Sequence, residues 1–245
     1  MLLLLLLHFS SIYIHLIAAD SYAEEGDFPF EVAIAYQGVD ICGGAIVSEY
    51  LILTAAHCIR YLEANELAIY AGVHDYYVFP RGHKYEVNST YIHPQYDAST
   101  RDYDVALVRL KNALKLKTPG VDSIEIVTTS QANYGGILAT LVYWELEPGT
   151  RLLYTDIELW SQKQCTAGNI FGDFAASVDL PPPNNGIICA GIPAGSCIGD
   201  DAGSLVVNHQ LWGVVSLNID CDSEDKPLIL TNLAYVREWL DEYYL

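Results

Sequence analysis

Short β-rich runs separated by turn signals constrain the fold of this chain more than any other feature of its sequence. Apolar, β-branched and aromatic residues recur at 32–36, 44–53, 67–70, 105–110, 136–143, 187–190, 204–207 and 211–217. No helical period intervenes between these runs, and this pattern is typical of an all-β barrel or sandwich. Only residues 234–245 change period, because Val236, Leu240 and Tyr243 lie near helical spacing, which predicts an amphipathic terminal helix.

The first nineteen residues have the character of a secretory signal. Residues 2–7 are an unbroken leucine run, the apolar character continues to Ile17, and Ala18 and Ala19 supply small residues for cleavage. A transmembrane anchor is the alternative, but its length is marginal and polar residues interrupt it. We therefore expect a signal peptide at 1–19, a secreted, extracellular domain at 20–245, and no membrane span in the mature chain.

Cysteine content fits this compartment. The six cysteines are Cys42, Cys58, Cys165, Cys189, Cys197 and Cys221. An even number behind a signal peptide predicts three disulfides, and counting alone leaves 15 possible pairings. Asn88 opens the single N-glycosylation sequon of the chain, Asn88-Ser89-Thr90, and is the predicted glycosylation site.

The chain is strongly acidic, with a formal net charge of −19. Residues 1–120 carry 8 basic and 14 acidic side chains, whereas residues 121–245 carry 4 and 17. Such a surface repels nucleic acid and anionic membranes and favours cationic partners. The simpler interpretation is that the charge only keeps a secreted protein soluble.

Three segments carry residues suited to catalysis. His57 follows an apolar strand and adjoins Cys58, which suggests an imidazole held rigidly at a strand end. Asp104 begins another apolar strand and offers a carboxylate that can orient an imidazole through its ring N–H. Residues 199–203 form a glycine-flanked turn, which exposes a side chain and aims backbone N–H groups at a developing oxyanion.

In this order the three segments resemble those of the trypsin- and chymotrypsin-like serine proteases, the peptidase S1 family. The separations of 47 and 97 residues suit its His, Asp, Ser order. Gly26-Asp27-Phe28-Pro29, His93-Pro94-Gln95-Tyr96 and Trp239 match further family positions, so the resemblance spans residues 20–245.

The resemblance implies a particular architecture. Its fold is two six-stranded antiparallel β-barrels, placed here at about 20–120 and 121–233, with a C-terminal α-helix at 234–245. The implied disulfides are Cys42–Cys58, Cys165–Cys189 and Cys197–Cys221.

At the nucleophile the chain departs from the family. The family motif Gly-Asp-Ser-Gly-Gly-Pro is replaced here by Gly199-Asp200-Asp201-Ala202-Gly203-Ser204, so Asp201 stands in place of the serine. A carboxylate is a weaker nucleophile, its acyl product would be an anhydride, and an ionised Asp201 gives His57 no proton to accept. We expect His57, Asp104 and Asp201 to be an inactive remnant of the triad, and Gly199 and Asp201 a remnant of the oxyanion hole.

Two further departures point the same way. The family's new N-terminal ammonium pairs with the Asp before the serine, but the aligned Ile17 lies inside the predicted signal peptide, so Asp200 lacks that partner. The specificity pocket has Gly195 at its base instead of Asp, and Asn218 and Leu228 on its walls, which predicts that side chains fill it.

These observations predict a catalytically inactive serine protease homologue that acts by binding extracellular proteins. Basic proteins, proteases and protease inhibitors are the expected partners, with a role as regulator or decoy in extracellular proteolysis. Persistence of His57 and Asp104 is then explained by packing, because removing either buried partner leaves the other unsatisfied. The alternative is a serine endopeptidase-like hydrolase with residual or altered activity.

No cofactor is expected. A metal site built from His57, Asp104, Asp200 and Asp201 is a weaker alternative, because the sequence offers no helical His spacing to support it.

Overall fold

The computed structural model describes residues 20–75, 83–129, 134–145, 151–166, 185–192, 198, 202–218 and 227–243. Strands dominate and the helices are short, which confirms the expected all-β class. The strands are β1 Ser21–Tyr22, β2 Glu31–Tyr36, β3 Val39–Ile46, β4 Leu51–Thr54, β5 Leu67–Ala71, β6 His83–Ile92, β7 Ala106–Leu110, β8 Glu125–Ile126, β9 Leu138–Trp144, β10 Leu152–Glu158, β11 Ile187–Ala190, β12 Ser204–Val207, β13 Gln210–Asn218 and β14 Leu228–Asn232. The helical segments are α1 Ala56–Ile59, the 3₁₀ helix η1 Ala64–Glu66, α2 Gln162–Thr166 and α4 Arg237–Asp241.

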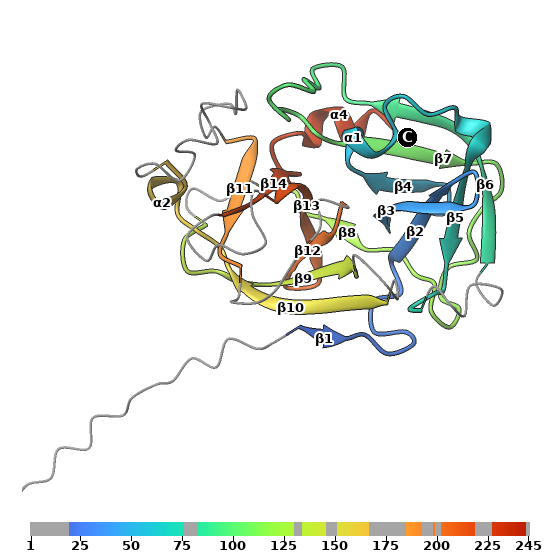
Figure 1. The fold of residues 1–245 in the computed structure, drawn as a ribbon, viewed down its shortest axis with the longest axis horizontal. Helices are drawn as coiled ribbons and strands as arrows, with labels where there is room; N and C mark the ends of the chain where they lie inside the picture. The colour runs from blue at the N-terminus through green and yellow to red at the C-terminus, as the bar shows by residue number, and fades with distance from the viewer. Residues whose placement is uncertain are drawn as a thin grey trace, which may run out of the picture.

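Strands β2 to β7 close into an antiparallel barrel in the order β2-β3-β4-β7-β6-β5, at the right of Figure 1. Strand β4 shows why the run Leu51-Ile52-Leu53 is continuously apolar. Its side chains alternate between two cores: Ile52 packs inside the barrel, while Leu51 and Leu53 pack on the outer face that meets the second sheet. Both faces of this strand are therefore buried.

The second sheet contains the six longer strands β9 to β14. Hydrogen bonding gives the order β1-β10-β9-β12-β13-β14-β11, and the two-residue β8 pairs with β13. An isolated bridge between Leu159 and Ala190 joins the end of β10 to β11 and brings the two ends of the six-strand series together. The two-residue strands β1 and β8 are additions to the expected six.

One apolar core connects the two β units. Leu53 and Leu107 of the first barrel belong to the same buried cluster as Leu141, Leu205 and Leu230 of the second sheet. The buried indole of Trp144 also donates from Nε1 to the carbonyl of Val32 at 3.3 Å. The junction of the barrels is therefore closely packed, and the candidate site lies along it.

Two expectations from the sequence were wrong in detail. Residues 44–53 do not form one strand: Val47, Ser48, Glu49 and Tyr50 make a turn between β3 and β4, closed by a hydrogen bond from the Val47 amide to the Leu51 carbonyl.

The terminal helix starts at Arg237 rather than at residue 234. The Asn232 side chain accepts the Ala234 amide and the Asn232 carbonyl accepts the Tyr235 amide, which hold a turn before α4. The helix ends at Asp241, and residues 244–245 lie outside the described residues.

Two of the three disulfides implied by the family resemblance are present, Cys42–Cys58 and Cys165–Cys189. Cys197 and Cys221 lie outside the described residues. Within the described ranges, no helix is long and apolar enough to cross a membrane.

Candidate functional site

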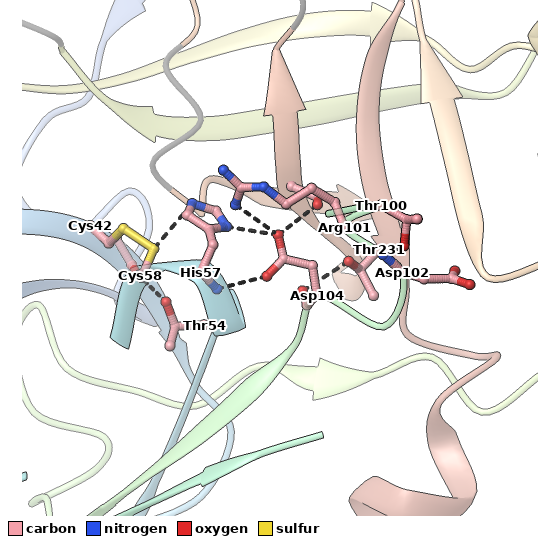
Figure 2. Close-up of polar contacts among 11 residues, drawn as sticks. Cys42, Thr54, His57, Cys58, Thr100, Arg101, Asp102, Asp104 and Thr231 are labelled. Carbon is pink, nitrogen blue, oxygen red and sulfur yellow. Dashed lines mark hydrogen bonds and ion pairs between the residues drawn. A yellow bond between two sulfur atoms is a disulfide. The ribbon is translucent and has the colours of Figure 1, made fainter. Parts of the chain in front are cut away.

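His57 is placed by the end of β4 and the single turn of α1. Thr54 closes β4 by donating from Oγ1 to the carbonyl of Gly43 at 2.9 Å, and Ala55 is extended before the turn begins. The disulfide between Cys42 and Cys58 fastens this turn to β3 (Figure 2). The imidazole is thus held on short, well-anchored backbone.

His57 makes two separate hydrogen bonds to the carboxylate of Asp104. The main-chain N–H of His57 donates to Oδ1 at 2.8 Å, and the ring Nδ1 lies 2.7 Å from Oδ2. Because an ionised carboxylate only accepts, Nδ1 carries the proton in this contact. The pair therefore retains the orientation in which a carboxylate fixes an imidazole.

The second sheet also holds Asp104. Ser216 of β13 donates from Oγ to Oδ2 at 2.7 Å, and Thr231 of β14 donates from Oγ1 to the main-chain carbonyl at 2.9 Å. Asp104 itself is fully buried. This one residue therefore ties the loop before β7 to two strands of the other barrel.

Arg101 adds a cation to the same carboxylate. Its Nη1 lies 3.3 Å from Oδ2 of Asp104, and Figure 2 shows the guanidinium and the His57 ring approaching the same oxygen. Both Arg101 and Tyr103 have left-handed backbone, with φ of 62° and 53°. This conformation is unfavourable for residues with a Cβ, so the loop adopts a strained path to Asp104.

The sequence motif His93-Pro94-Gln95-Tyr96 supports this strained loop. The His93 ring stacks on Tyr103 with centroids 4.6 Å apart and meets Trp239 edge-on at 4.9 Å. The His93 amide donates to the Val105 carbonyl at 3.1 Å, directly after Asp104. Burial lowers the pKa of His93, so the neutral ring suits this aromatic stack.

Burial and hydrogen bonding have opposite effects on Asp104. Burial alone would raise the pKa of its carboxyl, but the bonds from His57 and Ser216 outweigh burial and leave the pKa below its ordinary value of 3.8. Asp104 is therefore a stable anion at neutral pH.

The segment that follows Asp201 is also tightly packed. Ala202 has φ of 59° and is fully buried, so this position keeps a conformation that favours the glycine of the family motif. A Cβ on Gly203 would lie 2.9 Å from the carbonyl oxygen of Val142, so only glycine fits there. Ser204, where the family has proline, donates from Oγ to Oε2 of the buried Glu31 at 2.6 Å.

Of the three predicted pocket residues, Leu228 is the best described. It is fully buried in the main core and its strand β14 pairs with Ala190 of β11 and Asn218 of β13. The main chain of Asn218 ends β13. Gly195, at the expected base of the pocket, lies outside the described residues.

Three other expected site positions, Gly199, Asp200 and Asp201, also fall outside the described residues. The structure therefore brings together His57 and Asp104 but does not describe the position of Asp201. Asn88, the predicted glycosylation site, is exposed on β6 at a bulge between Val87 and Ser89.

Cys42, His57 and Cys58 form the one group with metal-ligand spacing among the described residues. Both cysteines are joined in a disulfide, so neither can supply the thiolate that zinc or iron would need. The weaker metal alternative from the sequence involves Asp200 and Asp201, which are not described.

A six-stranded β-barrel joined to a second β unit, with a buried Asp–His pair at their junction, defines the class of two-barrel serine proteases. The family model for trypsin matches residues 17–240. Hypodermin-A of Hypoderma lineatum is 32% identical over 219 residues, covering 86% of this chain and 80% of that protein. Trypsin alpha of Drosophila melanogaster is 30% identical over 220 residues, covering 87% and 81%.

A solved structure agrees at the level of fold. Neuropsin, described as a serine protease expressed in the limbic system of mouse brain, superposes with a TM-score of 0.77 at 23% identity and covers 92% of this chain and 99% of that one. The chain belongs to the trypsin family.

Local sequence motifs indicated His57 and Asp104 but not Ser216, Arg101 or the Glu31–Ser204 pair. Each acts across a large sequence distance or from an unusual loop conformation, for example 112 residues between Asp104 and Ser216. The replacement of the motif proline by Ser204 was the one local signal that could have pointed to a new polar contact.

Proposed function

We propose that this chain is a secreted, catalytically inactive member of the trypsin family that acts by binding other extracellular proteins. The observation that carries the proposal is the sequence at the nucleophile, where Asp201 replaces serine. Attack by a carboxylate on a peptide carbonyl would form a mixed anhydride, and His57 would have no hydroxyl proton to accept.

The surroundings of His57 support this proposal. Oδ2 of Asp104 already accepts from His57, Ser216 and Arg101, so the His–Asp pair is held in a saturated polar cluster at the barrel junction. This cluster accounts for retention of His57 and Asp104 without catalysis, since loss of the carboxylate would remove the acceptor of the buried Ser216 hydroxyl and of the partly buried His57 and Arg101 donors.

Two further elements of the proposal come from the sequence. Residues 1–19 serve as the signal peptide and 20–245 as the mature domain, with Asn88 as the glycan site. We also take the specificity pocket to be filled, with the buried Leu228 on one wall and Asn218 and Gly195 at the other expected positions.

A fluorophosphonate probe provides the direct test, because it labels only an activated serine. We expect no covalent labelling of the purified secreted chain, measured beside trypsin as a positive control. Labelling that disappears in His57→Ala would refute the proposal.

Asp201→Ser tests whether the nucleophile is the only loss. We expect this single variant to remain inactive on tryptic peptide substrates, because the pocket lacks its usual Asp at Gly195 and Asp200 lacks the usual N-terminal partner. The measurement is release of the fluorophore from a fluorogenic Arg substrate. Robust cleavage by the single variant would contradict this account of the pocket and of Asp200.

A second candidate is a hydrolase with residual or altered activity. The observation in its favour is the intact contact between His57 Nδ1 and Asp104, which an active relative would also need. Casein hydrolysis that His57→Ala abolishes would support this candidate, whereas hydrolysis unaffected by His57→Ala would indicate a contaminant.

A further inference from the structure

A groove of about 690 Å³ lies away from the His57–Asp104 site. Its walls come from residues 27–30, the segment around β8, the starts or ends of β9 and β10, and the β12–β13 turn. Strands β9 and β10 lie at the bottom of Figure 1, whereas α1, which carries His57, lies at the top. The volume is within the range of ligand sites in proteins.

Part of the lining of the groove is apolar. Phe28, Ile124 and Val206 line it, and Leu138 adds an apolar side chain that is 67% exposed. An exposed leucine at the edge of an apolar hollow leaves surface that a partner can cover.

The rim of the groove is acidic. Asp27, Glu125 and Asp156 are all exposed lining residues, and no lysine or arginine is among the lining residues that the structure describes. Asp27 accepts the Glu24 amide at 2.9 Å and Asp156 accepts Thr140 Oγ1 at 2.9 Å, so two of the carboxylates have fixed positions. Among the described lining residues, His209 is the fourth that can ionise.

We propose that this groove is a docking site for a cationic segment of a partner protein, in which lysine or arginine side chains alternate with apolar ones. Charge complementarity selects this occupant: the apolar residues cover Phe28 and Leu138 while the cations meet three carboxylates. An anionic segment would be repelled, and so would a second copy of this chain, whose net charge is −19. The proposal extends the proposed binding function but uses no residue of the His57–Asp104 site.

The test is fluorescence anisotropy with a fluorescein-labelled hexapeptide of alternating arginine and leucine, on the full secreted chain. Two peptides serve as controls, one with glutamate in place of arginine and one with serine in place of leucine. We expect saturable binding of the arginine–leucine peptide alone, with affinity falling by about ten-fold or more when NaCl rises from about 20 to about 500 mM.

Two matched triple variants locate the site. Asp27→Asn/Glu125→Gln/Asp156→Asn removes three charges from the rim while keeping oxygen acceptors for Glu24 and Thr140. Glu49→Gln/Glu63→Gln/Glu238→Gln removes three exposed charges elsewhere. We expect the first to weaken binding by about ten-fold or more and the second by less than about two-fold. Leu138→Ser, at an exposed position, is expected to weaken it about three-fold or more.

Equal loss in both triple variants, absence of binding by the wild-type chain, or equal binding of the serine-substituted peptide would overturn the groove as the docking site. These outcomes are independent of the proposed loss of catalysis, because fluorophosphonate labelling reports on the His57 site alone. A chain that is labelled and still binds the peptide through the rim would refute inactivity and leave the groove in place.

Discussion

The carboxyl group of Glu31 is buried away from water. The side chain is 1% exposed, Ser204 donates to Oε2, and Oε1 has no partner with hydrogen-bond geometry within the described residues. Burial raises the pKa of Glu31 well above its ordinary value of 4.5, more strongly than the bonds from Ser204 and the Gly44 main chain lower it. The folded protein thus favours a protonated Glu31.

The raised pKa of Glu31 makes the free energy of unfolding depend on pH in a defined direction. A folded-state pKa above the unfolded value means that the folded state binds the extra proton, so the free energy of unfolding falls as pH rises from about 4.5 through the folded pKa. Glu31→Gln removes the titration and keeps an acceptor for Ser204, and we expect it to add about 1–3 kcal/mol at pH 8. Urea unfolding at pH 4 and pH 8 measures this. The exposed Glu49→Gln is the control, and equal effects of both variants would contradict the account.

The pKa shift of Asp104 gives the opposite dependence of stability on pH. Its carboxylate accepts from several donors and has a lowered pKa, so its contribution to stability is present above about pH 3.8 and is lost as pH falls further. We expect Asp104→Asn to lower the free energy of unfolding at pH 7 by about 2–4 kcal/mol, because the amide removes the negative charge and replaces one acceptor oxygen with an NH2 group that faces other donors.

Asp241→Asn makes the same chemical change in an exposed ion pair with Arg237, where the aspartate is 53% exposed. A surface pair of this kind contributes below about 1 kcal/mol. Chemical denaturation of both variants gives the comparison, and a similar small loss for Asp104→Asn would show that its cluster is not structural.

At the scale of elements, most of the apolar runs predicted strands, but β6, β10 and the fully buried β14 were not among the predicted runs. The runs at 187–190 and 204–207 match β11 and β12 to the residue. Strand β6 was missed because its burial pattern is mostly exposed or intermediate, with Val87 its one buried residue. The turn between β3 and β4 was missed because Ser48 is its one common turn residue, and Val47-Ser48-Glu49-Tyr50 contains no glycine, proline or asparagine.

For the site, local motifs predicted His57 and Asp104 but could not predict the residues that reach them from afar. Ser216 lies inside a run that was predicted as an ordinary strand, and only the tertiary fold places its hydroxyl on Asp104. Arg101 reaches Asp104 from a backbone with positive φ, which arginine rarely adopts. The conformational preference of arginine therefore did not indicate this contact.

The disulfide between Cys42 and Cys58 is expected to be a main support of α1. It closes a loop of 16 residues, for which loss of unfolded-chain entropy corresponds to about 3 kcal/mol. We therefore expect Cys42→Ser/Cys58→Ser to lower the unfolding free energy by about 2–4 kcal/mol, measured by denaturant titration. The single variant Cys42→Ser under reducing conditions controls for loss of the thiol itself, and a change below about 0.5 kcal/mol in the double variant would contradict the estimate.

On the scale of the whole molecule, the two β units share one core and a set of buried polar links. All four tryptophans, Trp144, Trp160, Trp212 and Trp239, lie in the second half of the sequence, whereas backbone signals report both halves. We expect far-UV circular dichroism and tryptophan fluorescence to follow one coincident unfolding transition. Two separate midpoints would show that the barrels unfold independently despite the shared core.

The bond from the His57 amide to Oδ1 of Asp104 has a consequence for how this molecule can be observed. An N–H held by a fully buried carboxylate, itself anchored to β13, exchanges with solvent deuterium only when the barrel junction opens. Its exchange rate therefore records the free energy of that opening, with no substrate or turnover required. The amide of His57 therefore reports on the integrity of the junction between the two β units, whatever the chain's activity.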